Sequence, residues 1–354
     1  MATTSNFTTT KVAVLLILCL QNSLFTLVRR YSQGVLLETY SKYEVLLVGE
    51  LIKMLFSAYV ISKSNDEHQN RRRLGNHFYY LLSTSRKMFF LALIYGLMNI
   101  LSYVALRNIS ASLFTICAQL KILTTATFSS IILNRKYSAV KWRALLILSI
   151  GVLLFSEPLW NSDEAKLPTN ENKMNVILGT AAVLTEVILS GFASIYFEKV
   201  IKTDVEQLNI WERNFQLALA SFPVYLTFIA AYRGEEEGYF GGWSWVTFWL
   251  AFLGAAGGLL VALSIKYGDA ILKTLATTGA IVLSALLDHA WLGGPLTAVM
   301  SLAGCIVVLA IFDYTFDPTP QTFNVAEILA KSSGSSEDIE SLSCHEDIDM
   351  GKKS

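Results

Sequence analysis

Cysteine, histidine and net charge are all scarce in this chain. Its 354 residues include only four cysteines and four histidines, and 28 basic residues balance 28 acidic ones. The cysteines, at positions 19, 117, 305 and 344, lack the spacing of a zinc site, so we expect neither a metal ion nor a disulfide framework. A neutral chain has no general attraction to nucleic acid, and no nucleic-acid partner is predicted.

Catalytic signatures are missing as well. The sequence contains no Gly-x-Ser-x-Gly, no His-Glu-x-x-His and no phosphate-binding loop. We therefore predict no catalytic residue and no cofactor, and we do not expect an enzyme.

Hydrophobic residues, in contrast, make up 53% of the chain, and charged residues only 16%. This composition is typical of a helical membrane protein, and each apolar stretch is long enough to cross about 30 Å of hydrocarbon. We predict an all-α membrane protein with ten transmembrane helices, the first of them uncleaved. The predicted spans are 12–30, 43–61, 88–106, 110–133, 143–160, 174–197, 209–231, 244–265, 270–291 and 295–314.

Two lysines interrupt these apolar spans in the same sequence context. Lys121 lies in Leu120-Lys121-Ile122-Leu123, and Lys273 lies in Leu272-Lys273-Thr274-Leu275. A lysine near the middle of a membrane helix costs about 2.5–3.5 kcal/mol on insertion scales. The cost is tolerable where the ammonium group faces a wet cavity and meets an anion. The five spans before and after the midpoint then predict a 5+5 inverted repeat with an anion site between the halves.

Further polar residues lie in neighbouring spans. Glu50 and Lys53 are three residues apart and share a helix face; they are either a self-neutralising pair or part of the cavity wall, and both can hold. Asn99, with Tyr103 one turn later, either bridges two helices or contacts a base or sugar. Other candidates are Phe114 beside Lys121, Ser190 and Gly191 in the sixth span, and Asn214 in the seventh.

Several longer segments resemble the nucleotide-sugar transporter family, in the branch that carries CMP-sialic acid, UDP-galactose and UDP-N-acetylglucosamine. The resemblance runs from about residue 12 to residue 315. The run that begins at Gly191-Phe192-Ala193 and ends at Glu198-Lys199 is its most specific piece. The other pieces are Glu50-Leu51-Ile52-Lys53, Tyr103-Val104-Ala105-Leu106, Gln119-Leu120-Lys121-Ile122, Arg213-Asn214-Phe215-Gln216 and Lys266-Tyr267-Gly268-Asp269.

The resemblance implies exchange of a nucleotide sugar for a nucleoside monophosphate across the Golgi membrane or, as an alternative, the ER membrane. Lys121 and Lys273 would hold phosphate, and Gly191 would allow close helix packing. Lys53, Glu50, Asn99, Tyr103, Phe114, Ser190 and Asn214 would complete the substrate site. The expected segments are a cytosolic N-terminus (1–11), two five-helix repeats (12–160 and 174–314), a lumenal loop (161–173) and a disordered acidic cytosolic tail (315–354), with both termini cytosolic.

The choice of substrate follows from two departures. Family members that carry CMP-sialic acid tend to have tyrosine where this chain has Phe114 and Ala218. A UDP-sugar, namely UDP-N-acetylglucosamine, UDP-N-acetylgalactosamine or UDP-galactose, is therefore favoured over CMP-sialic acid.

Two other functions stay open at this point. One is a small-metabolite exporter of the same superfamily, although the two lysines argue against a cationic substrate. The other is a membrane scaffold, which would bind no nucleotide. The sequence also leaves open whether the protein forms a homodimer in the bilayer.

Overall fold

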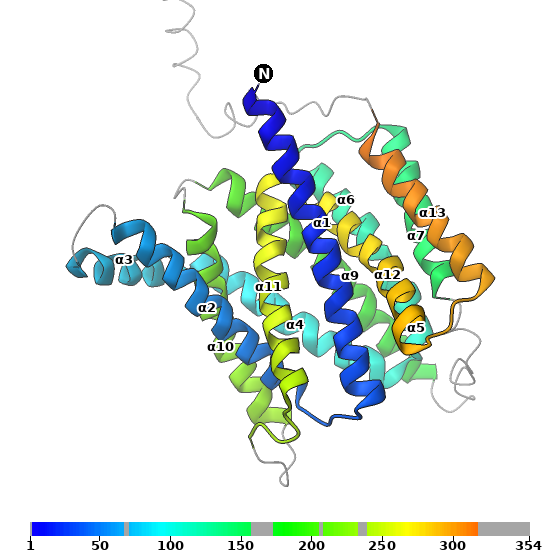
Figure 1. Cartoon of the computed structure of the whole chain (residues 1–354), viewed down its shortest axis with the longest axis horizontal. Helices are drawn as coiled ribbons and strands as arrows, with labels where there is room; N and C mark the ends of the chain where they lie inside the picture. The colour runs from blue at the N-terminus through cyan, green and yellow to red at the C-terminus, as the bar shows by residue number, and fades with distance from the viewer. Residues whose placement is uncertain (1, 67–70, 157–172, 205–207, 233–238, 318–354) are drawn as a thin grey trace, which may run out of the picture.

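The computed structural model is a bundle of long helices, and it describes residues 2–66, 71–156, 173–204, 208–232 and 239–317 (Figure 1). These residues form helices and connections only. In chain order the elements are α1 (Ala2–Arg30), a π-helical turn η1 (Tyr31–Val35), α2 (Lys42–Asp66), α3 (Arg71–Ser83), α4 (Arg86–Asn108), α5 (Ala111–Ala118), α6 (Leu120–Ile132), α7 (Ala139–Phe155), α9 (Lys173–Thr203), α10 (Ile210–Tyr232), α11 (Trp245–Tyr267), α12 (Ala270–Leu292) and α13 (Ala298–Thr315).

Nine segments of the described chain are long and apolar enough to cross a membrane. They coincide with nine of the ten predicted spans, so the all-helical membrane class is confirmed. The remaining prediction, 143–160, overlaps α7, which has 17 residues and lies below the length required of a span. The ten-helix count and its 5+5 repeat therefore stay predictions.

Two boundaries differ from the sequence prediction. The segment 1–11, expected to precede the first helix, is continuous with it, because α1 already begins at Ala2. The single span predicted for 110–133 is divided at Gln119 into α5 and α6. At this break the amide of Gln119 bonds the carbonyl of Ile116 at 3.3 Å, and the amide of Ile122 bonds the carbonyl of Gln119 at 3.2 Å. Both bonds span three residues, which tightens the backbone locally.

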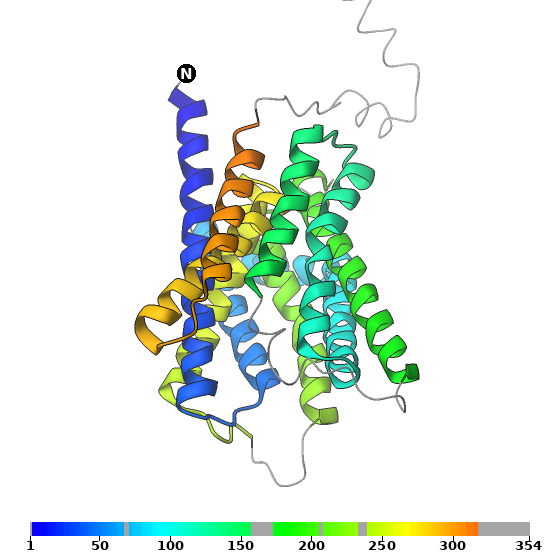
Figure 2. The same cartoon turned by 90° about the vertical axis from the view of Figure 1, so that its right-hand side faces the viewer.

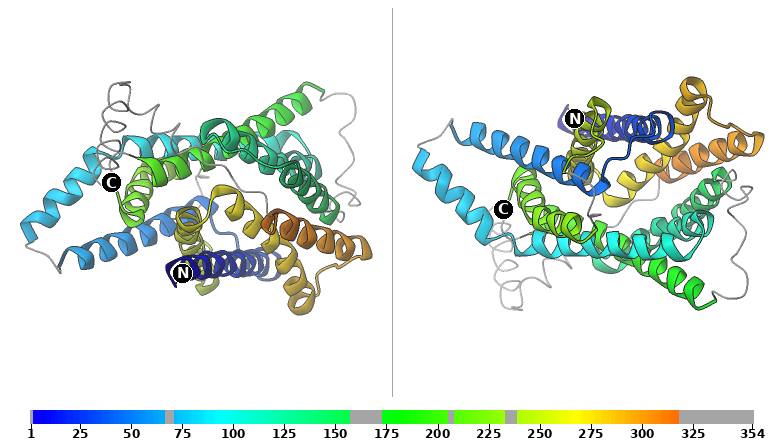
Figure 3. Two further views of the ribbon diagram at one scale, coloured as in Figure 1. Left: turned by 90° about the horizontal axis from the view of Figure 1, so that it is seen from above. Right: turned by 90° about the horizontal axis from the view of Figure 1, so that it is seen from below.

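The predicted loop 161–173 and the predicted tail 315–354 fall almost entirely outside the described residues, since α9 begins at Lys173 and α13 ends at Thr315. Among the described helices α3 stands out, because its sequence begins with three arginines and it projects from the bundle beside α2 (Figure 3). Seen along the bundle, α2 and α3 lie at one end of an elongated outline, and α13 lies at the other (Figure 3).

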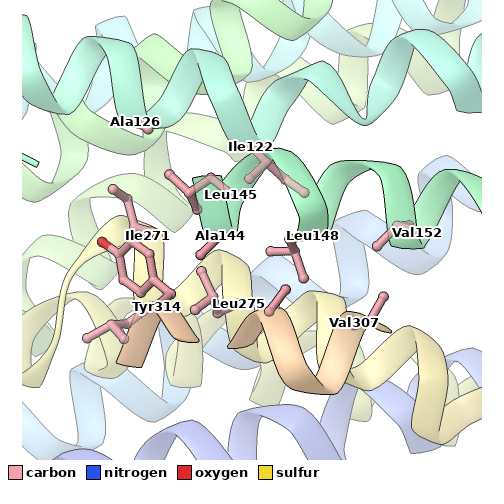
Figure 4. Packing of buried hydrophobic residues seen from close by; sticks show 12 residues of the cluster. Ile122, Ala126, Ala144, Leu145, Leu148, Val152, Ile271, Leu275, Val307 and Tyr314 are labelled. Atoms are coloured by element: carbon pink, nitrogen blue, oxygen red, sulfur yellow. The ribbon is translucent and has the colours of Figure 1, made fainter. Parts of the chain in front are cut away.

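Buried aliphatic side chains hold α6, α7, α12 and α13 together. Ile122, Leu145 and Val307 are essentially inaccessible to solvent, and Leu148 and Leu275 pack between them (Figure 4). The long helices run beside one another in the side view as well, with α13 next to α7 (Figure 2). This packing fixes α6 and α12, the two helices that carry the lysines singled out above.

Candidate functional site

Lys121 and Lys273 approach each other from two helices that are far apart in sequence. Lys121 is the second residue of α6, and Lys273 is the fourth residue of α12. The two ammonium groups lie close enough to interact electrostatically. Lys121 is exposed, whereas Lys273 is half-buried and donates a long hydrogen bond of 3.4 Å from Nζ to the Ser194 hydroxyl. Two like charges near each other repel, so this pair suits an anionic ligand.

Two carboxylates on α9 face this pair of lysines. The charge of Glu186 acts on Lys121, and the charge of Glu198 acts on Lys273. Glu186 also accepts a hydrogen bond from the Ser102 hydroxyl of α4. One oxygen of Glu186, Oε2, is buried without a partner among the described residues. Glu186 and Glu198 therefore neutralise the positive charge of the two lysines only in part.

Gly191 brings α9 against α6 next to the lysines. A Cβ at this position would lie 2.7 Å from Oγ1 and 2.9 Å from the carbonyl carbon of Thr124, closer than real Cβ contacts. The Thr124 hydroxyl in turn donates to the carbonyl of Val187 at 3.2 Å. Ser190 is half-buried and stands one helical turn before Ser194, on the same face of α9. The glycine therefore permits the close approach that sets these serines beside α6 and α12.

Glu50 and Lys53 form a second group on α2. Lys53 Nζ lies 2.7 Å from Glu50 Oε1, and both side chains are largely buried. They line a cavity of about 300 Å³ between α1, α2 and α11. A Cβ on Gly258 would meet the Lys53 side chain at 2.9 Å, so the glycine makes room for the lysine. Glu50 Oε2 is buried without a hydrogen-bond partner in the described chain.

Asn99 belongs to this second group. Its amide donates to the carbonyl of Tyr95 at 3.0 Å, and its side chain also hydrogen-bonds Tyr225 of α10. Both Tyr95 and Tyr225 lie within electrostatic range of Glu50. Asn99 thus links α4 to α10 close to the Glu50–Lys53 pair.

The other predicted site residues have separate surroundings. Asn214 is buried and donates to the carbonyl of Ile210 on its own helix at 3.0 Å. The ring of Tyr103 faces the ammonium of Lys42 at 5.8 Å. Phe114 packs on a hydrophobic cluster that includes Val183 of α9. The structure thus brings together Lys121, Lys273 and α9, and separately Glu50, Lys53 and Asn99.

Gln21 of α1 is a residue that sequence reasoning did not assign to a site. Its side chain is buried in the cavity with Lys53, donates to the carbonyl of Leu253 at 2.7 Å, and leaves Oε1 without a described partner. A Cβ on Gly257 would lie 2.6 Å from its amide nitrogen. The sequence did contain a sign of this role, because a polar amide inside an apolar membrane span is costly and often marks a functional site.

Arg135 and Glu198 form the centre of a buried ion network at the start of α12. Arg135 Nη2 contacts Glu198 Oε1, and Lys202 Nζ lies 2.8 Å from the same oxygen. Glu198 Oε2 accepts the backbone amide of Ala270 at 3.0 Å. Burial acts to lower the pKa of Arg135, but the carboxylates of Glu198 and Asp269 outweigh it and raise that pKa above its ordinary value. The arginine therefore stays charged, and it ties the α6–α7 connection to α9 and α12.

The described residues contain no group of three or more histidine, cysteine or acidic side chains that could hold a metal ion.

Comparison with known proteins covers almost the whole helical region. Residues 6–315 match the family model described as nucleotide-sugar transporter. The chain is 36% identical over 315 residues to the UDP-N-acetylglucosamine transporter of Canis lupus familiaris, which covers 86% of this chain and 94% of that protein. It is 32% identical over 318 residues to the UDP-galactose transporter of Schizosaccharomyces pombe, covering 86% and 87%.

A solved crystal structure shares the fold, with a TM-score of 0.64 at 14% sequence identity, over 87% of this chain and 97% of that one. The matched family comprises transporters and not enzymes. Together with the helical bundle and its paired lysines, the family match leads to one conclusion: the chain belongs to the nucleotide-sugar transporter family.

Proposed function

We propose that this protein carries a UDP-sugar across the membrane in exchange for UMP. The observation that supports this most directly is that both lysines lie against one stretch of α9: Gly191 packs on Thr124, one turn after Lys121, and the Ser194 hydroxyl accepts a hydrogen bond from Lys273 Nζ at 3.4 Å. Two neighbouring ammonium groups inside a helical bundle repel each other, and a diphosphate between them replaces this repulsion by two attractions. The relatives named as UDP-N-acetylglucosamine, UDP-N-acetylgalactosamine and UDP-galactose transporters favour the same class of substrate.

In this proposal Lys121 and Lys273 bind the phosphates, and Ser190 with Ser194 borders the same space. The group of Glu50, Lys53 and Asn99 contacts the base, ribose or sugar from the other side of the bundle. Tyr103, Phe114 and Asn214 have separate surroundings in the structure and are proposed to contact the substrate only when it is bound, and Gly191 keeps α9 against α6. CMP-sialic acid fits less well, because Ala218 is buried and offers no hydroxyl where such carriers have tyrosine.

The packing of the helices supports a 5+5 inverted repeat. In such a repeat the equivalent helices of the two halves are α1 and α9, α2 and α10, α4 and α11, α6 and α12, and α7 and α13. The contact of α1 with α11 then becomes that of α9 with α4, and the contact of α1 with α12 becomes that of α9 with α6. The contact of α2 with α11 becomes that of α10 with α4, while α2–α10 and α7–α13 map onto themselves. Such a two-fold relation favours alternating access around a site between the halves.

Exchange follows from the cost of an empty site. A carrier without ligand would have to change its orientation with two ammonium groups facing each other, and this step should be slow. Bound UDP-sugar or UMP neutralises them during the crossing. We further propose a Golgi membrane location, with the ER as the alternative, both termini in the cytosol, and no cofactor.

Uptake into proteoliposomes tests this function. Vesicles loaded with UMP should accumulate labelled UDP-N-acetylglucosamine, UDP-N-acetylgalactosamine or UDP-galactose much faster than empty vesicles. Lys121→Gln and Lys273→Gln should nearly abolish uptake, whereas Lys199→Gln, which removes an exposed lysine of α9, should not. Equal uptake by empty vesicles would refute exchange, and full transport by both variants would refute the assigned phosphate site. CMP-sialic acid as the better substrate would refute the choice of nucleotide.

A further inference from the structure

A groove of about 410 Å³ lies on the side of the bundle between α1, α12 and α13. Its walls are mostly aliphatic, with Leu15 of α1 facing Leu275 and Ala276 of α12. Val12 and Leu16 belong to the same lining and are 50% and 60% exposed, so the groove opens sideways toward the surroundings of the bundle. In a membrane-spanning bundle, these surroundings are lipid.

One end of this groove is basic. Lys11 from the third turn of α1 and Lys141 from the first turn of α7 line it near the end of α13, and Lys141 is only 6% exposed. Neither lysine forms an ion pair with a carboxylate of the described chain. Asp269 also lines the groove, but it caps α12 through the amide of Leu272 at 2.7 Å and faces Arg135 at 3.9 Å. The groove therefore combines an apolar body with two cationic side chains at one end.

Tyr314 supplies an independent sign of a missing partner. Its side chain lines the groove, is only 4% exposed, and carries a hydroxyl with no hydrogen-bond partner in the described chain. The Lys141 ammonium lies 5.8 Å from the centre of its ring. Figure 4 shows the tyrosine beside Ile271 of α12 and Ala144 of α7. A buried hydroxyl without a hydrogen-bond partner is unfavourable, so a ligand that accepts a hydrogen bond from it is favoured here.

We propose that this groove binds a phospholipid with an anionic headgroup. The phosphate lies between the ammonium groups of Lys11 and Lys141, and the Tyr314 side chain, whose hydroxyl is buried in the structure, turns to donate a hydrogen bond to it. An acyl chain runs along Leu15, Leu272, Leu275 and Gly279. Basic pockets between membrane helices select anionic headgroups in this way, because each lysine near the surface adds attraction. A soluble anion would leave the apolar walls uncovered, and a zwitterionic lipid would leave one cation unpaired.

Binding to the purified full-length protein tests this proposal without any transport measurement. Native mass spectrometry should detect one tightly retained phosphatidylinositol or phosphatidylserine, and weaker retention of phosphatidylcholine with the same acyl chains. Lys11→Gln and Lys141→Gln should each weaken retention of the anionic lipid about fivefold. Lys136→Gln, which removes an exposed lysine of the α6–α7 connection outside the groove, should leave retention unchanged.

A thermal-shift series with the same lipids checks the result if Lys141→Gln folds poorly, since Lys11→Gln and Tyr314→Phe can then be compared with the unmodified protein. Anionic lipid should raise the unfolding temperature more than phosphatidylcholine, and Tyr314→Phe should reduce this difference. Equal stabilisation by both lipids would overturn the headgroup assignment. Stabilisation by inorganic phosphate alone would show that the basic end binds a free anion, and unchanged lipid retention in all three variants would place the lipid elsewhere.

Discussion

The two ends of α12 are held in different ways. At its first residues, Glu198 is 0% exposed and Arg135 is 4% exposed, and Lys202 and the α12 backbone complete the network. At its last turn, Asp288 pairs with Arg30 of α1, whose side chain is 49% exposed. α12 also carries Lys273, so the comparison bears on the proposed site. A buried network is costly to open one partner at a time, whereas the Arg30–Asp288 pair joins a half-exposed arginine to a carboxylate that is only 9% exposed, so its arginine separates more easily. The last turn of α12 is therefore held less firmly by charge than its first residues are.

Glu198→Gln should produce the largest effect. The substitution leaves Arg135 buried without its closest charged partner, and breaking such a pair costs about 3–5 kcal/mol. Unfolding of the detergent-solubilised protein, followed by intrinsic tryptophan fluorescence, measures the loss. Asp288→Asn is the matched change of a carboxylate to an amide at the other end of α12. An equal loss in the two variants would contradict the difference between the ends.

Gly191→Ala should have the next largest effect. Gly191 stands two turns before Glu198 on the same face of α9, and a methyl group there would lie within 3 Å of the Thr124 side chain and backbone. Forcing α9 away from α6 should cost about 1–3 kcal/mol. The unfolding measurement used for Glu198→Gln detects it.

Gly75→Ala is the control for this change, because a Cβ on Gly75 of α3 has no neighbour within 4 Å. It should be neutral or stabilising by up to about 1 kcal/mol. A Gly191→Ala protein as stable as the parent would show that α9 and α6 can separate at no cost. The Arg135–Glu198 network at the start of α12 would then hold these helices less firmly than its contacts indicate.

Much of this difference was not accessible from the sequence. Spans are readable, because a run of about 20 apolar residues already satisfies the requirement of the bilayer. Lys121 and Lys273 are readable, because an ionisable residue is conspicuous in such a run. The partners are not: Arg135 and Glu198 are 63 residues apart, and their distance depends on how α6 and α9 pack. The resemblance included Glu198 in its most specific run but assigned it no role.

The break at Gln119 illustrates the same limit. Hydropathy is continuous from α5 into α6, so the pattern predicted one helix, and only the local hydrogen bonds of Gln119 reveal two. Likewise Gln21 was visible as a polar residue in an apolar span, but its neighbour Gly257 lies 236 positions later in the chain and meets it only through packing.

Arg30→Gln should destabilise the protein less than Glu198→Gln, because the arginine that is lost is half exposed, although the Asp288 carboxylate that stays behind is only 9% exposed. Its effect should also shrink as salt is added, since solvent-exposed charges are screened. Unfolding at low and high ionic strength measures both. A loss as large as that of Glu198→Gln, or one insensitive to salt, would mean that the Arg30–Asp288 pair is as firmly held as the network at the start of α12.

The smallest effect should come from Glu38, which lies in the connection between η1 and α2, on the same side of the bundle as the Arg30–Asp288 pair. Burial alone would raise the pKa of this carboxyl, but hydrogen bonds from Ser244, Ser32 and Thr247 outweigh it and hold the pKa below its ordinary value. The Ser32 and Thr247 hydroxyls lie 2.5 Å and 2.9 Å from Glu38 Oε2. A carboxyl with a lowered pKa in the folded state stabilises the protein above its unfolded pKa. That stability is lost as the pH falls through the lower, folded pKa.

Unfolding of the parent and of Glu38→Gln between neutral and acidic pH tests this. Glu38→Gln should be slightly less stable at neutral pH, and the difference should vanish in acid, because the protonated parent then resembles the amide. Thr247→Val, which removes one hydroxyl donor, should give an intermediate difference with the same pH dependence. A stability difference between parent and Glu38→Gln that persists unchanged into acid would show that the charge of Glu38 does not contribute to stability. The stability of this end of the bundle would then not depend on the protonation of Glu38.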